Sequence, residues 1–361
     1  MIERRLFHHL DWLLVGAVLT LCLISCAQIY SATGGPTRVY YTQMYGVVVG
    51  LAAMLICVAV DYRTLTDKSH LVYGFVMALL LYVALFGAVR GGSRRWIELG
   101  PFNLQPSEFA KVAVALVLAK MFGEGRRGIP SKGDLMMAGV ITAIPLVLIA
   151  RQPDLGTAVT LLPIALLIAY VAGMPMRILG VLALVGVLAA PVAWTFALKD
   201  YQRTRVLTFL DPSQDARGAG YQQIQARITV GSGGLWGKGF TKGTQGQLRF
   251  LPVAHNDFIF SVLAEELGFL GVLVALGLYL FVIARALEAA RLAKDRLGAY
   301  LVVGLLASFT FQVIYNITMS AGLAPVKGLT LPLMSYGGSS MIATLAGFGL
   351  ILNVRMRRFT N

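Results

Sequence analysis

The feature that most constrains the fold is a series of apolar blocks, each roughly twenty residues long, spread over the whole chain. A helix of about 20 residues is needed to cross a hydrocarbon core about 30 Å thick. The composition agrees with membrane helices, because 57% of the 361 residues are hydrophobic and only 13% are charged. We therefore expect an all-α polytopic membrane protein with ten transmembrane helices, at residues 12–30, 40–60, 70–89, 106–122, 134–150, 155–173, 177–197, 257–284, 298–320 and 332–353.

One long polar stretch, residues 199–255, separates the seventh and eighth predicted helices. No linker or low-complexity tract divides the chain, so we expect one membrane domain over 1–361, with this stretch as a long extracytoplasmic loop. Its run Gly231-Ser-Gly-Gly-Leu-Trp-Gly-Lys-Gly239 resembles a phosphate-binding loop only in composition. The run lacks the Gly-Lys-Ser/Thr ending and the strand-to-helix context of such loops, so we interpret it as turns.

Lysine and arginine residues predict the orientation. Ten helices place both termini on one side, and with that side inward the inner segments hold fifteen Lys and Arg residues against six in the short outer loops. This asymmetry predicts cytoplasmic termini. The long loop adds eight more outside, and we interpret this excess as a surface that attracts an acidic substrate. Contact with anionic outer-leaflet lipids is the alternative.

Several classes of function are excluded or unsupported. The net charge of +14 suggests an anionic partner, but no soluble basic domain is available for nucleic acid, and anionic lipid headgroups match the charge better. The three cysteines lie in apolar segments and the four histidines are scattered, so neither a disulfide framework nor a zinc motif is expected. Because many helices follow it, the first apolar segment is interpreted as an uncleaved helix rather than a signal peptide.

Asp257 stands where the long loop meets the eighth predicted helix. The helical pattern from Asp257 to about Ala284 would be about 40 Å long, which exceeds the hydrocarbon core and leaves the first turn among the headgroups. Asp257 would then be either a helix-start carboxylate that interacts with the helix dipole or a functional acid. The basic loop before it favours function, as do Glu265 and Glu266 inside the same predicted helix, because intramembrane acids are functional candidates.

Four polar stretches fall on the predicted outer face, and together they predict a charged, partly wet cavity. They are residues 91–98 with 105–111, residues 151–156, the long loop with 201–212, and residues 325–339. In the last stretch Pro325, Pro332 and the Gly337-Gly338 pair predict a broken start to the tenth helix. Irregular backbone at membrane depth is tolerated only where it is buried or lines a wet cavity.

Single residues in these stretches have two interpretations each. Glu108 and Lys111 are three residues apart and share one helix face, either to bind substrate or to lock two helices together, since buried membrane charges usually pair. Trp96 either lines the cavity or anchors the chain in the interfacial aromatic belt. Asp154 either faces the cavity or caps the sixth helix.

The chain contains five motifs of note: Arg95-Trp96, Gln105-Pro-Ser-Glu-Phe-Ala-Lys111, Gln152-Pro-Asp-Leu-Gly156, residues 255–268 and residues 327–339. These motifs are similar to those of the SEDS family (shape, elongation, division and sporulation) of polytopic peptidoglycan glycosyltransferases. The resemblance covers nearly the whole chain in order. Asp211-Pro-Ser, Gly218-Ala-Gly-Tyr and Lys242-Gly-Thr-Gln245 are similar to the elongation branch, whereas Lys327 with Gly-Leu-Thr-Leu-Pro is closer to the division branch. Asn256 stands where many members carry Thr.

The resemblance implies a substrate and a reaction. The substrate would be lipid II, a disaccharide-peptide carried on undecaprenyl pyrophosphate. The GlcNAc 4-hydroxyl of the acceptor would attack the anomeric carbon of the donor MurNAc, invert its configuration and release the pyrophosphate. Asp257 is the expected general base. The expected substrate-binding residues are Arg95, Trp96, Glu108, Lys111, Asp154, Arg203, Arg205 and Lys327, and a divalent cation, Mg or Mn, would be a plausible further source of positive charge.

The resemblance also implies a place and a partner. We expect a multi-pass protein of the bacterial cytoplasmic membrane that works with a class B penicillin-binding protein, a single-span transpeptidase. Three alternatives stay open: a lipid II flippase, the division paralogue with the same chemistry, and an inactive scaffold. A flippase should show internal repeats or helices broken at the bilayer midplane, and the sequence shows no repeat. A scaffold would explain neither Asp257 nor the basic loop.

Overall fold

The structure is a computed structural model that describes residues 9–90, 93–99, 102–125, 129–197, 200–215, 218–247 and 250–359. The long helices are α2 (Trp12–Ala32), α3 (Arg38–Ala59), α5 (Ser69–Phe86), α6 (Pro106–Gly123), α7 (Lys132–Arg151), α9 (Leu161–Val171), α10 (Met176–Val192), α14 (Ile259–Arg291), α15 (Arg296–Ser320) and α16 (Gly338–Met356). Shorter elements are α4 (Tyr62–Asp67), α8 (Leu155–Val159), α11 (Asp200–Leu210), α12 (Ala219–Ser232), α13 (Thr244–Gln247), a π-helical turn (Ala193–Ala197) and two 3-10 turns (Pro212–Asp215, Arg357–Phe359).

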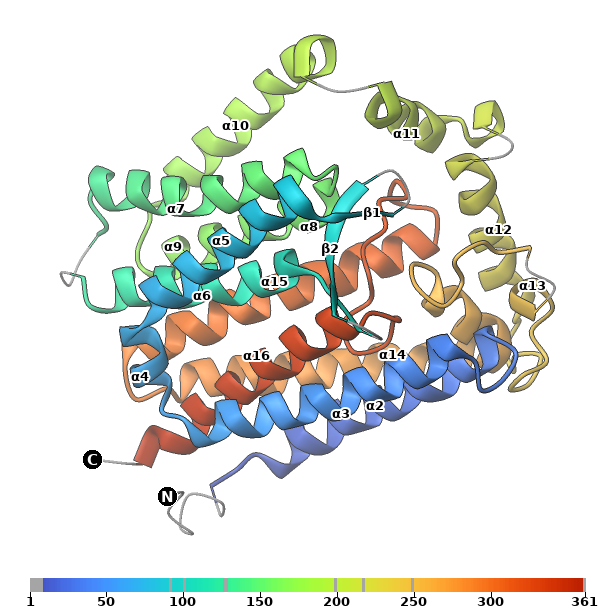
Figure 1. Cartoon of the computed structure of the whole chain (residues 1–361), viewed down its shortest axis with the longest axis horizontal. Helices are drawn as coiled ribbons and strands as arrows, with labels where there is room; N and C mark the ends of the chain where they lie inside the picture. The colour runs from blue at the N-terminus through green and yellow to red at the C-terminus, as the bar shows by residue number, and fades with distance from the viewer. Residues whose placement is uncertain are drawn as a thin grey trace.

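The long helices form an elongated bundle of roughly parallel rods (Figure 1). The start of α2 and the end of α16 lie at one end of the bundle, and α12, α13 and the strands lie toward the other. Eight helices in the described part of the chain are long and apolar enough to cross a membrane: α2, α3, α5, α7, α10 with its π-helical turn, α14, α15 and α16. The protein is therefore a polytopic membrane protein.

The two remaining predicted spans correspond to α6 and to the pair α8 and α9. Helix α6 carries Glu108, Lys111 and Lys120 within 18 residues, which lowers its apolar character. The pair α8 and α9 is a shorter apolar stretch, Leu155–Val171. That these two segments also cross the membrane, for a total of ten, stays a prediction.

The sequence signals for helix starts correspond to the observed starts. Asp11 accepts a hydrogen bond from the Leu14 N–H at 3.2 Å, and Ser131 with Asp134 forms a capping box at α7. Pro106 occupies the first turn of α6, where its missing N–H costs nothing. These local signals satisfy N–H groups that a helix leaves unpaired at its first turn.

Helices α15 and α16 form the centre of the bundle, because most of their residues are buried, whereas α10 buries none. Small residues let α3 lie close to α16. A Cβ on Gly50 would lie 2.6 Å from Leu345 Cδ1, and one on Gly349 would lie 2.5 Å from the Met54 carbonyl oxygen. Close backbone approach at small residues is a common basis of helix association in membranes.

A small antiparallel sheet is present that the all-α prediction did not include. Its strands are β1 (Ala88–Arg90), β2 (Ser93–Leu99) and β3 (Phe102–Leu104), in the order β1-β2-β3. Trp96 lies opposite Ala88, and Ile97 lies opposite Leu104. Strands of three and seven residues give almost no periodic signal in a sequence. The predicted helix 70–89 therefore ends earlier, at Phe86.

Helix α14 is broken, which corrects the prediction of one continuous helix from Asp257. The helix begins at Ile259, and Gly268 has non-helical angles, φ 66° and ψ −165°. Residues 259–266 are buried on every side, so they belong to the protein interior. The segment after the break, 269–291, is about 34 Å long and is sufficient to span the bilayer.

The glycine-rich run explains the break. The N–H groups of Lys238 and Gly239 donate to the carbonyls of Glu265 and Glu266, both at 3.0 Å, and the Phe269 N–H donates to the Gly234 carbonyl at 2.9 Å. These bonds replace the helical bonds that the break removes. The run therefore forms turns, as predicted, and these turns are packed against α14.

Glu265 has a structural role at the same junction. Its carboxylate pairs with Lys238 Nζ at 2.7 Å and accepts the backbone N–H groups of Thr244 and Gln245 at 2.9 and 3.1 Å. A carboxylate at a helix N-terminus is favourable, and here it attaches α13 to α14. The stretch 199–255 thus contains three helices, α11 to α13, and is not an unstructured loop.

Replacing Gly237 by Ala is expected to lower the unfolding temperature, because Gly237 has φ 77° and a Cβ there would lie 2.2 Å from the Glu266 carbonyl oxygen. We expect a cost of about 1–3 kcal/mol. Gly277→Ala in α14 is the control, since no atom lies within 4 Å of a Cβ there. Thermal unfolding of the purified variants in detergent measures the difference, and equal unfolding temperatures would contradict the packing argument.

Candidate active site

Asp257 lies in the turn just before α14 and does not cap that helix. The N-cap residue is Phe258, which makes no side-chain cap bond. The Asp257 carboxylate instead accepts a hydrogen bond from Asn256 Nδ2 at 2.9 Å. The Asp257 carboxylate therefore makes no cap bond to α14 and remains available for another role.

Asn316 of α15 joins the backbone of Asp257 to that of Leu329. Its fully buried amide nitrogen donates to the Asp257 carbonyl at 2.9 Å and to the Leu329 carbonyl at 2.7 Å. Gly328, with φ 65°, faces the Asp257 carboxylate. A Cβ at position 328 would be in van der Waals contact with Asp257 Oδ2, at 3.5 Å. We did not select Asn316 from the sequence, although a polar amide inside an apolar helix is a usable signal.

A cavity of about 220 Å³ lies beside Asp257, and we call it the Arg95 cavity. Asn256 and Gly328, the two neighbours of the Asp257 carboxylate, are among its walls. The strand β2, the starts of α6 and α8 and the irregular segment before α16 meet here. The other lining residues are Arg95, Trp96, Gln105, Glu108, Asp154, Thr157, Val253, His255, Leu329, Thr330, Tyr336, Gly337, Ser339 and Ser340.

Arg95 and Asp154 are fixed by hydrogen bonds at one wall. Arg95 Nε donates to the Gln152 carbonyl at 3.1 Å, and Nη2 donates to the Pro153 carbonyl. The remaining guanidinium nitrogen, Nη1, lies 3.9 Å from Asp154 Oδ1. Asp154 also accepts from the Thr157 N–H at 3.3 Å and from Gln105 Nε2 at 3.0 Å. The capping role predicted for Asp154 is thus confirmed, and its carboxylate lines the cavity as well.

The charges around the cavity influence one another. Burial raises the pKa of Asp257, which precedes the α14 span, to about 6; the cations Arg205 and Arg95 oppose this rise, and Asp154 adds to it. Burial also raises the pKa of Asp154, against the effect of Arg95. Burial and the neighbouring Arg205 lower the pKa of Lys327. Asp257 therefore lies within electrostatic range of two arginines and one carboxylate.

The structure brings together most of the predicted site residues. Arg95, Trp96, Glu108 and Asp154 line the Arg95 cavity, and Arg205 acts on both Asp257 and Lys327. The Lys327 ammonium lies 5.9 Å from the centre of the Tyr315 ring, within cation–π range.

Arg203 lies apart from this group. It donates to the Thr195 carbonyl at 2.9 Å and lies 3.8 Å from Asp200, so it contacts the segment after α10.

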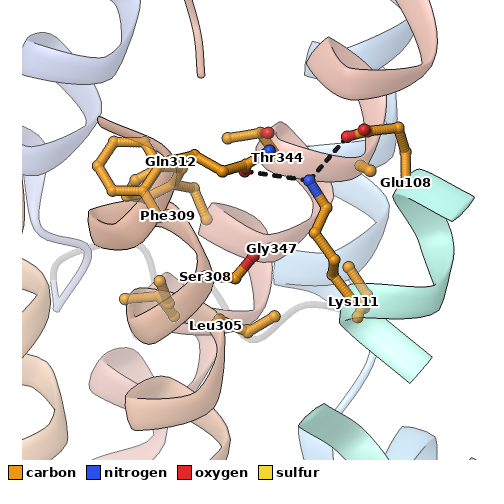
Figure 2. A pocket seen from close by; sticks show the side chains of 12 residues that line it. Glu108, Lys111, Leu305, Ser308, Phe309, Gln312, Thr344 and Gly347 are labelled. Atoms are coloured by element: carbon orange, nitrogen blue, oxygen red, sulfur yellow. Dashed lines mark hydrogen bonds and ion pairs between the residues drawn. The ribbon is translucent and has the colours of Figure 1, made fainter. Parts of the chain in front are cut away.

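Lys111 points into a second, smaller cavity. Figure 2 shows its ammonium between Glu108 Oε2, at 2.7 Å, and Gln312 Oε1, at 3.0 Å. This cavity of about 40 Å³ lies among α6, α15 and α16, and Glu108 lines both cavities. The predicted pairing of Glu108 with Lys111 is confirmed, and Gln312 extends it across to α15. Direct contact of Lys111 with substrate stays a prediction.

The described residues offer no ready metal centre. Across the described ranges, no group of three or more His, Cys, Asp or Glu side chains is arranged to hold a metal ion. Among the protein's own cations, Arg205 and Arg95 act on Asp257, and Lys327 lies close enough to Arg205 for its pKa to be lowered.

Comparison with known proteins decides the family. Residues 4–359 match the family of cell cycle proteins that comprises FtsW, RodA and SpoVE. The chain belongs to this family. It is 39% identical to the peptidoglycan glycosyltransferase MrdB of Escherichia coli strain K12 over 350 residues, which cover 97% of this chain and 94% of that protein.

Two solved structures are similar over almost the full length. One is a chain of a peptidoglycan synthase complex whose structure concerns the coordination of polymerization and crosslinking, with a TM-score of 0.86, 36% identity, and 98% and 99% of the two chains covered. The other is the rod shape determining protein RodA of Thermus thermophilus, with a TM-score of 0.74, 32% identity and 98% of each chain covered. The SEDS resemblance drawn from the motifs is thus confirmed.

The Glu108–Lys111 pair is expected to be energetically coupled. Breaking a buried pair by removing one partner leaves an uncompensated charge, so the double change Glu108→Gln with Lys111→Met should cost less stability than the sum of the single changes, by about 0.5–3 kcal/mol. The matched control is the Asp200–Arg203 pair, which has the same three-residue spacing, lies 3.8 Å apart and has a fully exposed carboxylate, so the changes there should add. Thermal unfolding of the singles and doubles gives both couplings, and additive effects at Glu108 and Lys111 would contradict the pairing argument.

Proposed function

We propose that this chain is a peptidoglycan glycosyltransferase that polymerises lipid II into glycan strands for cell elongation and shape. The observation that carries the proposal is Asp257, a half-buried carboxylate that makes no cap bond and lies beside a cavity lined by the hydrogen-bonded Arg95. Membership of the FtsW, RodA and SpoVE family and the similarity to MrdB and RodA support it. The reaction is an inverting transfer at the outer face of the bacterial cytoplasmic membrane.

Asp257 acts as the general base. The GlcNAc 4-hydroxyl of the acceptor gives its proton to the Asp257 carboxylate as its oxygen bonds to the anomeric carbon of the donor, and the bond from that carbon to the pyrophosphate breaks. A base is most effective when its pKa lies near the working pH, and burial raises the pKa of Asp257 to about 6. Asn256 and Asn316 hold the carboxylate and its backbone in place.

The cations of the site stabilise the leaving pyrophosphate. Its negative charge grows as the bond breaks, and fixed cations reduce the energy of that state without reorganising. Arg95 is held by two carbonyls, and Arg205 acts on both Asp257 and Lys327. Trp96, Glu108 and Asp154 contribute the surrounding walls for the sugars and phosphates. A divalent cation bound together with the pyrophosphate would add to this positive charge.

The proposed outer location of the site sets the orientation of the chain in the membrane. The site lies toward the end of the bundle away from the start of α2 and the end of α16 (Figure 1), so an outer site requires cytoplasmic termini. The chain then crosses the membrane ten times, with α11 to α13 outside. A class B penicillin-binding protein is the proposed partner, and the similarity to a chain of a peptidoglycan synthase complex supports it. Helix α10, which buries none of its residues, offers an apolar surface for a partner's membrane helix.

A lipid II flippase is less well supported. A transporter breaks its helices near the bilayer midplane, where the transported substrate binds. The break in α14 leaves a full span of about 34 Å after Gly268, so the break lies at one end of that span. Asp257 and the Arg95 cavity lie before the break. This arrangement suits chemistry at one membrane surface.

Replacing Asp257 by Asn is expected to abolish most strand synthesis and to preserve the fold. Asn keeps the size of the side chain but removes the basic oxygen, so polymerisation of lipid II by the purified protein with its partner should fall about 100-fold or more. Lipid II affinity and thermal unfolding should change little, because the arginines remain. Asp200→Asn, at an exposed position on α11, is the control. Normal strand synthesis by folded Asp257→Asn protein would disprove the general-base role.

The rate of polymerisation is expected to fall as the pH falls through about 6. The base must be deprotonated, and the pKa of Asp257 is raised to about 6, so the active fraction is lost below that pH. Arg205 opposes the rise, so Arg205→Gln should move the acid limb to higher pH. Arg203→Gln, at a cation that contacts Thr195 and Asp200, should leave the limb unchanged. Initial rates measured from about pH 4 to about pH 8, roughly 2 units on each side of that pKa, give the shift.

A further inference from the structure

One buried carboxylate joins three helix ends at the end of the bundle opposite Asp257. Asp11, just before α2, has a side chain only 1% exposed and pairs with Arg285 of α14 at 2.8 Å and with Arg355 of α16 at 2.6 Å. Glu288, one turn after Arg285, pairs with the same two arginines at 2.8 and 3.3 Å. The two guanidinium groups are therefore held in fixed positions. The proposed catalytic reaction uses none of these residues.

These arginines line an open cavity of about 310 Å³, which we call the Asp11 cavity. Three of its lining side chains are arginines, and Asp11 is the one lining carboxylate. Glu288, which pairs with Arg285 and Arg355, is a second carboxylate of this cluster and is 42% exposed. Three arginines against these two carboxylates give the cluster a formal net charge of +1 (3 − 2). The complete lining is His9, Leu10, Asp11, Trp12, Leu13, Arg285, Arg355 and Arg358.

Apolar side chains border the positive charge. Trp12 and Leu13, which line the cavity, are 61% and 62% exposed, and Leu287, two residues after Arg285, is 41% exposed. Tryptophan at the start of a membrane span marks the interface between headgroups and acyl chains. The cavity thus presents guanidinium groups at headgroup level beside apolar side chains at the start of the hydrocarbon.

We propose that the Asp11 cavity binds the headgroup phosphate of an anionic phospholipid, with the acyl chains against Trp12, Leu13 and Leu287. Guanidinium groups bind phosphate through paired N–H donors, and basic pockets between membrane helices on the cytoplasmic side suit anionic lipid headgroups. The buried ion pairs hold the donors in place, so little side-chain freedom is lost on binding. A soluble phosphate compound would not account for the exposed apolar border.

The proposal does not depend on the reaction at Asp257. The Asp11 cavity lies where the start of α2 meets the last turns of α14 and α16. Helix α2 is the first and α16 the last long helix of the described chain, and α14 is the helix broken at Gly268. A lipid seated in the cavity would contact all three through Trp12, Arg285 and Arg355. We therefore expect a bound anionic lipid to stabilise the folded protein.

The experiment is native mass spectrometry of the purified full-length protein with an equal mixture of phosphatidylglycerol and phosphatidylcholine of identical acyl chains. The protein should retain phosphatidylglycerol in preference to phosphatidylcholine, and Arg358→Gln should weaken that retention about fivefold, as the loss of one arginine near a lipid phosphate predicts. Arg291→Gln is the matched control, because Arg291 is an exposed arginine at the end of α14 that does not line the cavity. Thermal unfolding checks that both variants are folded.

A second variant keeps the test decisive if Arg358→Gln does not fold. The double change Asp11→Asn with Arg355→Gln removes a buried cation together with its anion, which avoids an unpaired buried charge, and it should also reduce phosphatidylglycerol retention. Equal loss in the Arg291→Gln control would show a diffuse charge effect and overturn the proposal. So would retention of both lipids alike by the unaltered protein, or stabilisation by inorganic phosphate alone as large as that by phosphatidylglycerol.

Discussion

The site depends on side-chain hydrogen bonds that replace helical backbone bonds inside the bundle. Residues 321–337 contain no helix, and unpaired backbone groups at membrane depth cost several kcal/mol each. Polar side chains of the surrounding helices supply partners instead. Asn316 donates to the Leu329 carbonyl, Tyr279 Oη to the Pro332 carbonyl at 2.7 Å, Ser25 Oγ to the Met334 carbonyl at 2.8 Å, and Gln43 Oε1 accepts the Gly337 N–H at 3.1 Å. Each of these partners is a polar side chain on a long, mostly apolar helix.

This arrangement explains how a cavity can be both polar and rigid. The walls around Asp257 consist largely of backbone, and the groups that hold them are fully buried, as Asn316 and Gln43 are. Arg95 is also held by backbone groups at another wall of the cavity, because it donates to the carbonyls of Gln152 and Pro153. A charge fixed in this way does not reorganise when a substrate charge develops, which is the basis of electrostatic catalysis.

Much of this arrangement could be predicted from the sequence, and the part that could not has physical reasons. Apolar blocks predict the spans, and the Glu108–Lys111 spacing predicts their pairing, because both depend on local periodicity. The sheet could not be predicted, since its strands are too short for a periodic signal. The break at Gly268 was missed because it depends on the close approach of a distant segment, the run around Gly237. Asn316 was missed for the same reason, because its partners lie in two other segments.

The break at Gly268 also explains the electrostatics of Asp257. An unbroken helix over 258–291 would be about 50 Å long, about 20 Å more than the hydrocarbon core, so its first turns would extend into water and Asp257 would keep the low pKa of an exposed carboxylate. The break turns residues 259–266 into the protein, where all are buried, and Phe258 is fully buried beside Asp257. Burial is the largest cause of the raised pKa. The glycines at 237 and 268 thus affect the surroundings of Asp257 through the path of the backbone, because they allow the contact that turns residues 259–266 into the protein.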